Sequence, residues 1–299
     1  MGREVAYRGG ERLVGELRRV REWPTGRDEY VLEFGERGAI SKLRFGKREV
    51  SKLAEMGEGE VEVEVEASAL NFRDVLNVLG MYPGEAGLMG LEFAGRVRAS
   101  KVAGMEVGSE VMGLGSNCFA RSTRGQGELV VKKPEGVTMA EAASAPVVFC
   151  TAMAVMEEAE LAGKTVLVHA AAGGVGAAAS QVALRMMGAK RVFGTAGSES
   201  KRAYARRWGA EPVVGSRDTR YSEEILEATG GAGANYVLNS LTGGEFVERT
   251  LACTSEEVHW SEIGKRGIAT MEEFAEAKPR GRYHVYDLGD DMREVPAKV

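Results

Sequence analysis

The pattern of hydrophobic and polar residues divides the chain into two parts. In the first part, residues 60–66 alternate valine and glutamate, which is typical of a β-strand with one face on a core and the other in water. Other stretches with strand character lie at residues 29–33, 92–98, 104–113 and 128–132, between glycine-rich connections. The first part therefore predicts a β-rich domain, with one short helix at residues 71–79 and Asn71 as its N-cap.

From about residue 138 the pattern changes to strands that alternate with helices. Thr138 and Glu141 fit the capping box that begins a helix, and an alanine-rich helical run follows to about residue 162. Buried strands are then predicted at residues 165–169, 191–195 and 235–239, and helices at residues 174–187, 198–208 and 243–251. This alternation is typical of βαβ units, so it predicts a parallel sheet with helices on both faces.

The two patterns together predict an α/β fold class with two domains. The expected boundaries are a linker at residues 1–24, a β-rich substrate-binding domain at 25–145, a doubly wound nucleotide-binding domain at 146–288, and a tail at 289–299. The tail is charged and shows no hydrophobic pattern.

Composition excludes several classes of protein. Lys and Arg number 39 and Asp and Glu 44, and the net charge of −5 argues against a nucleic-acid binder. The three cysteines are far apart and the three histidines lack ligand spacing, so we expect neither a disulfide framework nor a metal site. Because the chain has no run of 18 apolar residues and no visible signal peptide, we expect a cytoplasmic protein with no membrane partner.

The most specific motif is VLVHAAAGGVG at residues 166–176, where a buried strand meets a glycine turn that opens a helix. Against the pattern G-x-G-x-x-G, Ala171 replaces the first glycine, and Gly173 and Gly176 occupy the other positions. Gly173 would let the backbone approach a pyrophosphate, and Gly176 would let the helix pack on the strand. The residues expected to bind a dinucleotide here are Ala172, Gly173, Gly174, Val175 and Gly176. The alternative is a turn that merely packs closely.

The end of the second strand of the predicted parallel sheet bears on the choice of dinucleotide. An acidic residue there would bind the ribose of NAD, but this strand ends without one. The hydroxyls and cations that follow suit the 2′-phosphate of NADPH. The residues concerned are Thr195, Ser198, Lys201, Arg202 and, more weakly, Arg217. The alternative for Lys201 and Arg202 is a solvated first helical turn, and Glu199 between the strand and these cations opposes a phosphate.

Residues that follow the later strands are predicted to lie at the same edge of the sheet. Ligands of such folds bind beyond the carboxyl ends of the strands. The residues expected near the nicotinamide are Asn239, Ser240, Leu241, Gly264 and Lys265. Asn239 fits a turn residue equally well.

Several longer motifs carry a family resemblance. They are LNFRDVL at 70–76, GMYPG at 80–84, HAAAGGVG at 169–176, VLNSLTG at 237–243, EIGK at 262–265 and YHVYDL at 283–288. In this order they resemble the enoyl reductase domain of type I polyketide synthases, a zinc-independent medium-chain dehydrogenase/reductase. The resemblance covers residues 5–288 and implies a GroES-like domain followed by a Rossmann domain. Residues 7–13 resemble the segment that precedes this domain in megasynthases, which favours a synthase domain over a free-standing reductase.

The resemblance implies a reaction. NADPH would deliver a hydride to Cβ of a trans-α,β-unsaturated thioester on an acyl carrier protein, and the enolate would gain a proton at Cα. Tyr82, Lys265 and Asp287 match the family's catalytic candidates, and Tyr82 is associated with the stereochemistry at an α-methyl branch. Asn71 and Thr151 would contact the nicotinamide. Arg73 and Asp74 are expected to pair with each other.

Two alternative functions remain open at this stage. One is a stand-alone NADPH-dependent quinone or enone reductase, and the other is a non-catalytic nucleotide-binding domain within a synthase. The sequence also departs from the family pattern at two places. Residues 254–259 replace a Pro-Gly-Gly turn, so we expect the approach to Lys265 to be shifted. Residues 289–299 replace a longer tail that returns strands to the first domain, which predicts unpaired sheet edges and a doubtful activity for this chain alone.

Overall fold

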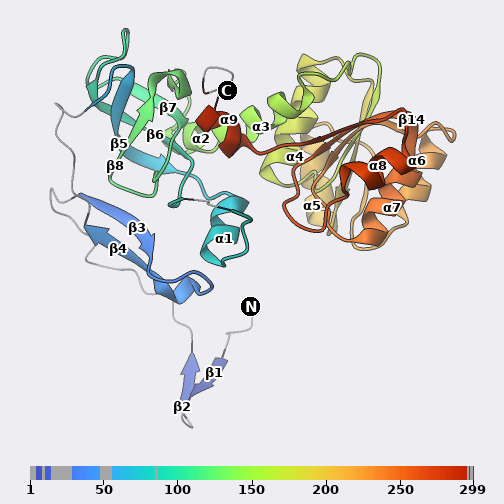
Figure 1. Ribbon diagram of the computed structural model, residues 1–299, viewed down its shortest axis with the longest axis horizontal. Coiled ribbons are helices and arrows are strands. Elements are labelled where there is room, and N and C mark those ends of the chain that lie inside the picture. The colour runs from blue at the N-terminus through green and yellow to red at the C-terminus, as the bar shows by residue number, and fades with distance from the viewer. Residues whose placement is uncertain are drawn as a thin grey trace.

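The computed structural model describes residues 5–8, 11–14, 29–47, 56–84 and 87–294, together with residues 296 and 299. Figure 1 shows two lobes side by side, with the helices α3 and α9 between them. Most of the predicted linker at 1–24 lies outside the described residues. Within it, β1 (Val5–Arg8) and β2 (Glu11–Val14) pair as an antiparallel hairpin.

The first lobe is built on a five-stranded antiparallel sheet with the strand order β8-β5-β6-β7-β9. Its strands are β5 (Glu60–Ser68), β6 (Glu92–Ser100), β7 (Glu110–Leu114), β8 (Ser122–Gln126) and β9 (Val130–Lys132). A hairpin of β3 (Tyr30–Phe34) and β4 (Leu43–Lys47) joins this lobe through the hydrogen bond from Leu32 N–H to the Phe119 carbonyl, 2.7 Å long. The short helix α1 (Phe72–Val78) confirms the helix predicted after Asn71.

Strand β5 shows how far the alternating pattern holds. Val61 and Val63 are fully buried, as their positions predict. Glu62 departs from the prediction of a face in water, because it is 9% exposed and its carboxylate lies 3.0 Å from the guanidinium of Arg124. A neighbouring strand supplies this partner, and a pattern within one strand does not contain that information.

The second lobe has a six-stranded sheet with the order β12-β11-β10-β13-β14-β15, and all its neighbouring strands are parallel. The strands are β10 (Thr165–Val168), β11 (Arg191–Ala196), β12 (Val213–Gly215), β13 (Ala234–Asn239), β14 (Thr254–Glu262) and β15 (Arg282–Val285). The strands predicted at 165–169, 191–195 and 235–239 are confirmed. The short strands β12 and β15 were not predicted.

Helices cover both faces of this sheet. They are α4 (Gly174–Gln181), which continues as a π-helical turn (Val182–Met186), α5 (Glu199–Arg207), α6 (Tyr221–Ala228), α7 (Gly244–Ala252) and α8 (Met271–Ala277). Val166 and Val168 belong to the core on one face, and Leu167 belongs to the core on the other face. This two-sided burial explains why β10 reads as a continuous apolar run. The prediction of a doubly wound α/β domain is confirmed.

The helical run predicted from 138 to about 162 is wrong in its extent. It is divided into α2 (Met139–Ala143) and α3 (Pro146–Met156), and α3 ends before the predicted limit. Pro146 has no backbone N–H to continue the first helix, but it is well suited to begin the second. The capping box of Thr138 and Glu141 is present as predicted, with the Thr138 N–H donating to the Glu141 carboxylate over 2.9 Å.

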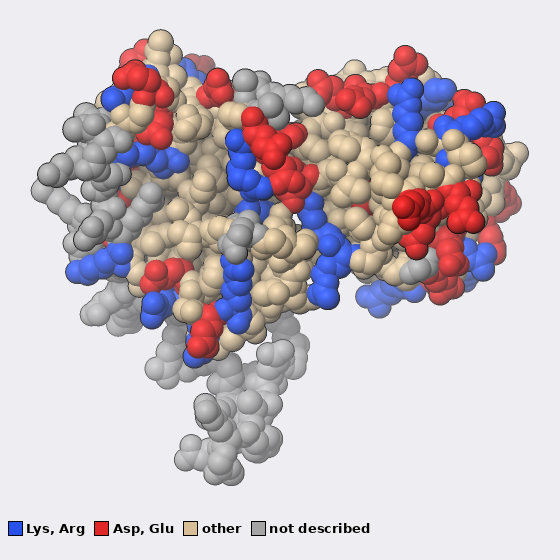
Figure 2. Space-filling view, viewed as in Figure 1, with Lys and Arg blue, Asp and Glu red and all other residues tan. Residues whose placement is uncertain are grey.

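The tail also differs from its prediction as a segment without pattern. Leu288–Glu294 forms helix α9, and Leu288 is buried in a core shared by both lobes. Leu91 and Leu114 of the first lobe belong to the same core. None of the helices in the described ranges is both long and apolar enough to cross a membrane. On the face shown in Figure 2, acidic and basic side chains are interspersed over both lobes, in keeping with the small net charge.

Candidate active site

The order of the strands reverses direction between β10 and β13, and such a switch point forms a crevice at the edge of the sheet. The chain runs from β10 outward to β11 and β12, and then returns to the other side of β10 as β13. The connections that leave β10 and β13 therefore go to opposite faces of the sheet. In sheets of this kind ligands bind at that point, beyond the carboxyl ends of the strands. Residues 169–174 and 239–243 occupy this position.

The glycine turn after β10 is shaped by close backbone contacts. A Cβ atom on Gly176 would lie 2.5 Å from the Ala170 carbonyl oxygen and 2.7 Å from Ala171 Cα, so only glycine allows this approach of α4. Gly173 is the N-cap of α4, and Gly173 and Gly174 are exposed. The N-terminus of a helix presents free N–H groups and a positive dipole end. The turn thus fits the diphosphate of a dinucleotide.

Thr195 lies behind this turn and not in front of it. Its side chain is fully buried, and its hydroxyl is hydrogen-bonded to His169 Nδ1 (3.1 Å) and accepts the Ala170 N–H (3.3 Å). The other ring nitrogen of His169 contacts the hydroxyl of Thr250 at 3.0 Å. The Thr195 hydroxyl is thus used to support the turn, and the expected contact of Thr195 with a cofactor stays a prediction.

The basic residues that follow β11 and β12 differ in whether an acidic residue pairs with them. Arg202 and Arg206 both form ion pairs with Glu199, at 2.8 and 3.0 Å. These two arginines of the same helix therefore neutralise the carboxylate that was expected to oppose a phosphate. Lys201 and Arg217 are exposed and form no ion pair with any residue that the structure describes. Ser198 caps α5 by accepting the Lys201 N–H at 3.4 Å.

Arg217 lies directly beside the turn that follows β11. Its Nε is 3.6 Å from the position that a Cβ of Gly197 would occupy. Two cations without an ion-pair partner among the described residues, one after each of two neighbouring strands, consequently lie near the end of β11.

A buried carboxylate that sequence reasoning did not single out organises the ends of β13 and β14. Glu262 is fully buried and accepts hydrogen bonds from the Asn239 amide (2.6 Å), the Gly264 N–H (2.7 Å) and the Trp260 indole (3.3 Å). Burial raises the pKa of Glu262, while these donors and Lys265 oppose the rise. The available signal was a glutamate at the end of an apolar strand, in the motif EIGK.

The same contacts decide the role of Asn239. Its amide also donates to the Leu241 carbonyl (2.9 Å), and its oxygen accepts the Leu241 N–H (3.2 Å). Asn239 is therefore a buried turn residue, which was the alternative left open by the sequence. Ser240 and Leu241 are partly exposed at the switch point, whereas Gly264 is buried against Glu262.

Tyr82, Lys265 and Asp287 meet at one carboxylate oxygen. The Tyr82 hydroxyl donates to Asp287 Oδ2, and Lys265 Nζ lies 2.9 Å from the same oxygen. Lys265 also donates to the Tyr286 carbonyl at 2.8 Å, and the Gly289 N–H donates to the other oxygen of Asp287, also at 2.8 Å. The cluster joins the first lobe, which supplies Tyr82, to loops at the carboxyl ends of β14 and β15.

This arrangement shifts the pKa values of Tyr82 and Asp287 in opposite directions. Burial and the hydrogen bond to Asp287 raise the pKa of Tyr82. Burial alone would raise the pKa of Asp287, but the hydrogen bonds from Tyr82 and Lys265 hold it below its usual value. Asp287 is therefore ionised at neutral pH and holds two proton donors.

Four further residues singled out in the sequence lie at the start of α1 and in α3. The expected pair of Arg73 and Asp74 does not form, because the Asp74 carboxylate accepts the backbone N–H groups of Asn71 (3.0 Å) and Gly90 (2.8 Å). The Asn71 amide donates to the buried Glu92 at 2.9 Å, so its nitrogen is already in use. Thr151 is buried in α3.

The expected shift in the approach to Lys265, relative to the family pattern, stays a prediction. The register between β13 and β14 is irregular only between Ala234 and Tyr236, and pairing is regular from Tyr236–His259 to Asn239–Glu262. The irregularity thus falls within the unusual residues 254–259, at the beginning of β14. Lys265 keeps its contact with Asp287.

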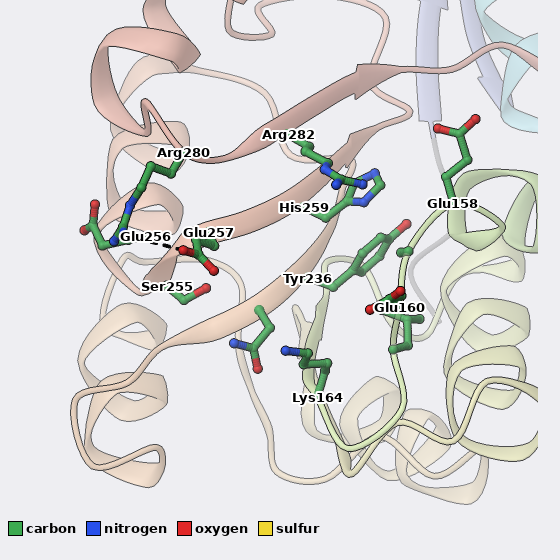
Figure 3. A pocket seen from close by; sticks show the side chains of 13 residues that line it. Glu158, Glu160, Lys164, Tyr236, Ser255, Glu256, Glu257, His259, Arg280 and Arg282 are labelled. Carbon is green, nitrogen blue, oxygen red and sulfur yellow. Dashed lines mark ion pairs between the residues drawn. The ribbon is translucent and has the colours of Figure 1, made fainter.

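A cavity of about 590 Å³ lies at the opposite, amino-terminal edge of the same sheet (Figure 3). Its acidic and basic side chains largely neutralise one another, as in the pair of Glu257 and Arg280 at 3.4 Å. It contains none of the residues predicted for the site. Among the residues that the structure describes, no group of three or more potential ligands is placed to hold a metal ion.

Comparison with known families defines the class of protein first. The family model "Alcohol dehydrogenase GroES-like domain" matches residues 57–158, and "Zinc-binding dehydrogenase" matches residues 174–279. With the strand order above, they identify a medium-chain dehydrogenase/reductase, an oxidoreductase with a GroES-like domain and a Rossmann domain.

Individual relatives narrow this class. The chain is 40% identical over 267 residues to the pikromycin polyketide synthase component PikAII of Streptomyces venezuelae, which covers 87% of this chain and 7% of that protein. The crystal structure of the CurK enoyl reductase superposes with a TM-score of 0.83 at 34% identity, covering 91% of this chain and 84% of that one. The chain belongs to the enoyl reductase domains of type I polyketide synthases.

A more distant structure adds a bound cofactor. Mycobacterial Rv1454c complexed with NADPH matches with a TM-score of 0.77 at 26% identity, over 89% of this chain and 83% of that one. The chain spans about 7% of the length of PikAII, so it corresponds to one domain of such a multidomain protein.

Proposed function

We propose that this chain is the NADPH-dependent enoyl-thioester reductase domain of a polyketide synthase. It adds a hydride to Cβ and a proton to Cα of a trans-2-enoyl chain that an acyl carrier protein holds. The observation that carries this proposal is the meeting of Tyr82, Lys265 and Asp287 at one carboxylate, close to the carboxyl edge of the parallel sheet. Other synthase domains and the carrier protein are its partners.

The residues present fit a phosphorylated dinucleotide. The turn of Ala172, Gly173, Gly174, Val175 and Gly176, in which Gly173 and Gly174 are exposed, binds the diphosphate through backbone N–H groups at the start of α4. Ser198, Lys201 and Arg217 bind the 2′-phosphate, and the lack of ion pairs for the two cations supports this assignment. The structure of Rv1454c with NADPH supports the same cofactor. When bound, the cofactor supplies the hydride.

Residues at the ends of β13 and β14 would hold the nicotinamide half. Ser240 and Leu241 contact it directly in this proposal, while Asn239, Gly264 and Glu262 hold the two turns beneath it. Thr151 and Asn71 approach it from α3 and from the start of α1. Since the Asn71 amide already donates to Glu92 and Thr151 is buried, these two residues shape the site more than they bind.

Asp287 keeps the proton donors in place. Lys265 has three N–H groups, of which two are used by Asp287 and the Tyr286 carbonyl, so one remains for the thioester oxygen or Cα. Tyr82 shares the oxygen of Asp287 and can exchange that hydrogen bond for one to the substrate. A cation beside the developing enolate stabilises its negative charge.

Consumption of NADPH with crotonyl-pantetheine tests the proposal. Lys265→Ala should reduce kcat by about 100-fold or more, which is the usual worth of a positioned acid. Tyr82→Phe should give a smaller loss and an altered configuration at an α-methyl branch, measured with a branched substrate. Binding of NADPH by both variants, measured by fluorescence, should match the unmodified chain.

The same measurements separate the alternatives. Rapid turnover of small quinones with no benefit from a carrier-bound thioester would favour a stand-alone reductase. Binding of NADPH without turnover of any enoyl thioester would favour a structural nucleotide-binding domain. Gly173→Val should abolish binding by blocking the diphosphate, and unchanged binding would contradict the assignment of the turn.

A further inference from the structure

Arg73 occupies an unusual position in the first lobe. It precedes the buried Asp74 in α1, yet that carboxylate is satisfied by two backbone N–H groups. The guanidinium of Arg73 instead lies over the ring of Tyr82, 5.2 Å from its centroid. Its Nε is buried and has no hydrogen-bond partner among the described residues. Such placement of a cation on an aromatic face is favourable by itself, and more so when water is excluded.

The charges around Tyr82 are unbalanced. Arg73 faces it from α1, and Asp287 faces it from the loop after β15. Lys265 approaches from the loop after β14, through the same Asp287 oxygen. Two cations and one carboxylate leave one positive charge in excess while Tyr82 is protonated. A phenolate at Tyr82 would make the group neutral. Burial and Asp287 raise the pKa of Tyr82, and Arg73 opposes that rise, so Arg73 favours the state that follows loss of the proton.

We propose that Arg73 is a positioning residue for proton donation, which holds the ring of Tyr82 against Asp287 and stabilises the phenolate. This inference rests on the proposed function and deepens it. After hydride addition at Cβ from the reduced dinucleotide, the substrate is an enolate. The electron pair of the enolate forms the new C–H bond at Cα with the proton of Tyr82, and the O–H bond of Tyr82 breaks. Tyr82 regains a proton from water before the next turnover.

The ionisation of Tyr82 tests this directly. Tyrosines are replaced by 3,5-difluorotyrosine, which ionises at lower pH, and are titrated by fluorine NMR, with Tyr82→Phe identifying the resonance. Arg73→Gln should raise the midpoint for residue 82 by about one pH unit or more. Arg73→Lys keeps a cation without the planar stacking, so it should give a smaller shift and serves if the glutamine variant does not fold.

Arg191 provides a matched control. It lies over the ring of Phe193 at 5.6 Å, at the beginning of β11 and away from the cluster. Arg191→Gln removes the same charge and the same type of contact, and it should leave the midpoint of residue 82 unchanged. An equal shift in both variants would mean a general effect of charge and would overturn the proposal.

Kinetics provide the second readout. Arg73→Gln should lower kcat by about tenfold, which corresponds to one unit of pKa, and leave the Kd for NADPH unchanged. In the Tyr82→Phe background the same substitution should have no further effect. An equal loss in both backgrounds, or an unshifted midpoint with normal turnover by the unmodified chain, overturns the role of Arg73 alone. Failure of the unmodified chain to reduce any enoyl thioester overturns the proposed function, and the role of Arg73 in the reaction with it.

Discussion

At the scale of single residues, the sequence predicts where in the fold a residue lies better than it predicts what the side chain does there. Thr195 and Asn239 lie at strand ends where the sequence predicts a ligand, but both turn their polar groups to the loops behind. The sequence pattern does not mark Glu262 as a site residue, but its carboxylate accepts hydrogen bonds from three N–H donors. The reason is physical: a polar side chain that is removed from water must be satisfied, and the partner can come from any element nearby.

His169 should make the stability of the protein depend on pH. Burial lowers its pKa from the ordinary value of 6.5 to about 3, so the folded state excludes a proton that the unfolded state accepts. Its contribution is fully present above pH 6.5 and is lost as the pH falls toward about 3. The slope attributable to this residue approaches about 1.4 kcal/mol per pH unit.

Urea unfolding at a series of pH values measures this effect. His169→Gln cannot take up the proton, so its free energy of unfolding should fall less steeply between pH 6.5 and 4 than that of the unmodified chain. Equal slopes for the two proteins would contradict the assignment.

At the scale of elements, long and regular segments are recognised and short or interrupted ones are missed. Strands β10, β11 and β13 are evident because burial on both faces leaves an uninterrupted apolar run. Strand β12 has three residues, too few to show a period. One proline divides the helical run that begins at residue 138, which its alanine-rich composition hides.

Gly176 should be essential for the placement of α4. Gly176→Ala puts a methyl group 2.5 Å from the Ala170 carbonyl oxygen, so the helix must move away from the strand. We expect a loss of about 1–3 kcal/mol in the free energy of unfolding, typical of overpacking, and weaker binding of NADPH. Thermal unfolding and a fluorescence titration measure the two effects.

Gly215 gives the control for that substitution. It ends β12, and a Cβ there would meet no atom within 4 Å. Gly215→Ala should therefore leave both stability and binding close to those of the unmodified chain. A harmless Gly176→Ala would show that the turn is less tightly packed than the distances indicate.

At the scale of the whole molecule, the two lobes share one core and one cluster of reactive groups. Leu91 and Leu114 from the first lobe and Leu288 from α9 belong to the same hydrophobic core as β10. Leu288 directly follows Asp287, so packing of α9 also fixes the carboxylate that holds Tyr82 and Lys265. Packing of the two lobes and the geometry of this cluster therefore depend on the same residues.

Leu288→Ala should weaken both the shared hydrophobic core and the cluster around Asp287. Removal of a buried leucine costs about 2–5 kcal/mol, and here the cavity would open next to Asp287. We expect a lower midpoint of thermal unfolding, and a fall in kcat measured below that temperature. Met271→Ala, at an exposed position of α8, is the control and should change neither. Loss of stability with full kcat would separate the shared core from the reactive cluster.

The sequence by itself determined the two-domain α/β architecture, the glycine turn, the main strands of the parallel sheet and the choice of Tyr82, Lys265 and Asp287 as candidates for one site. These features depend on local periodicity, on turn chemistry, and on motifs whose resemblance to a family is itself a property of the sequence. The tertiary structure alone decided which polar groups face the crevice and which support it. It also decided that Arg73 meets Tyr82 instead of Asp74, and that Tyr82 meets a carboxylate 205 residues away. Contacts of this kind are set by the packing of one lobe on the other, and no pattern within a single segment encodes them.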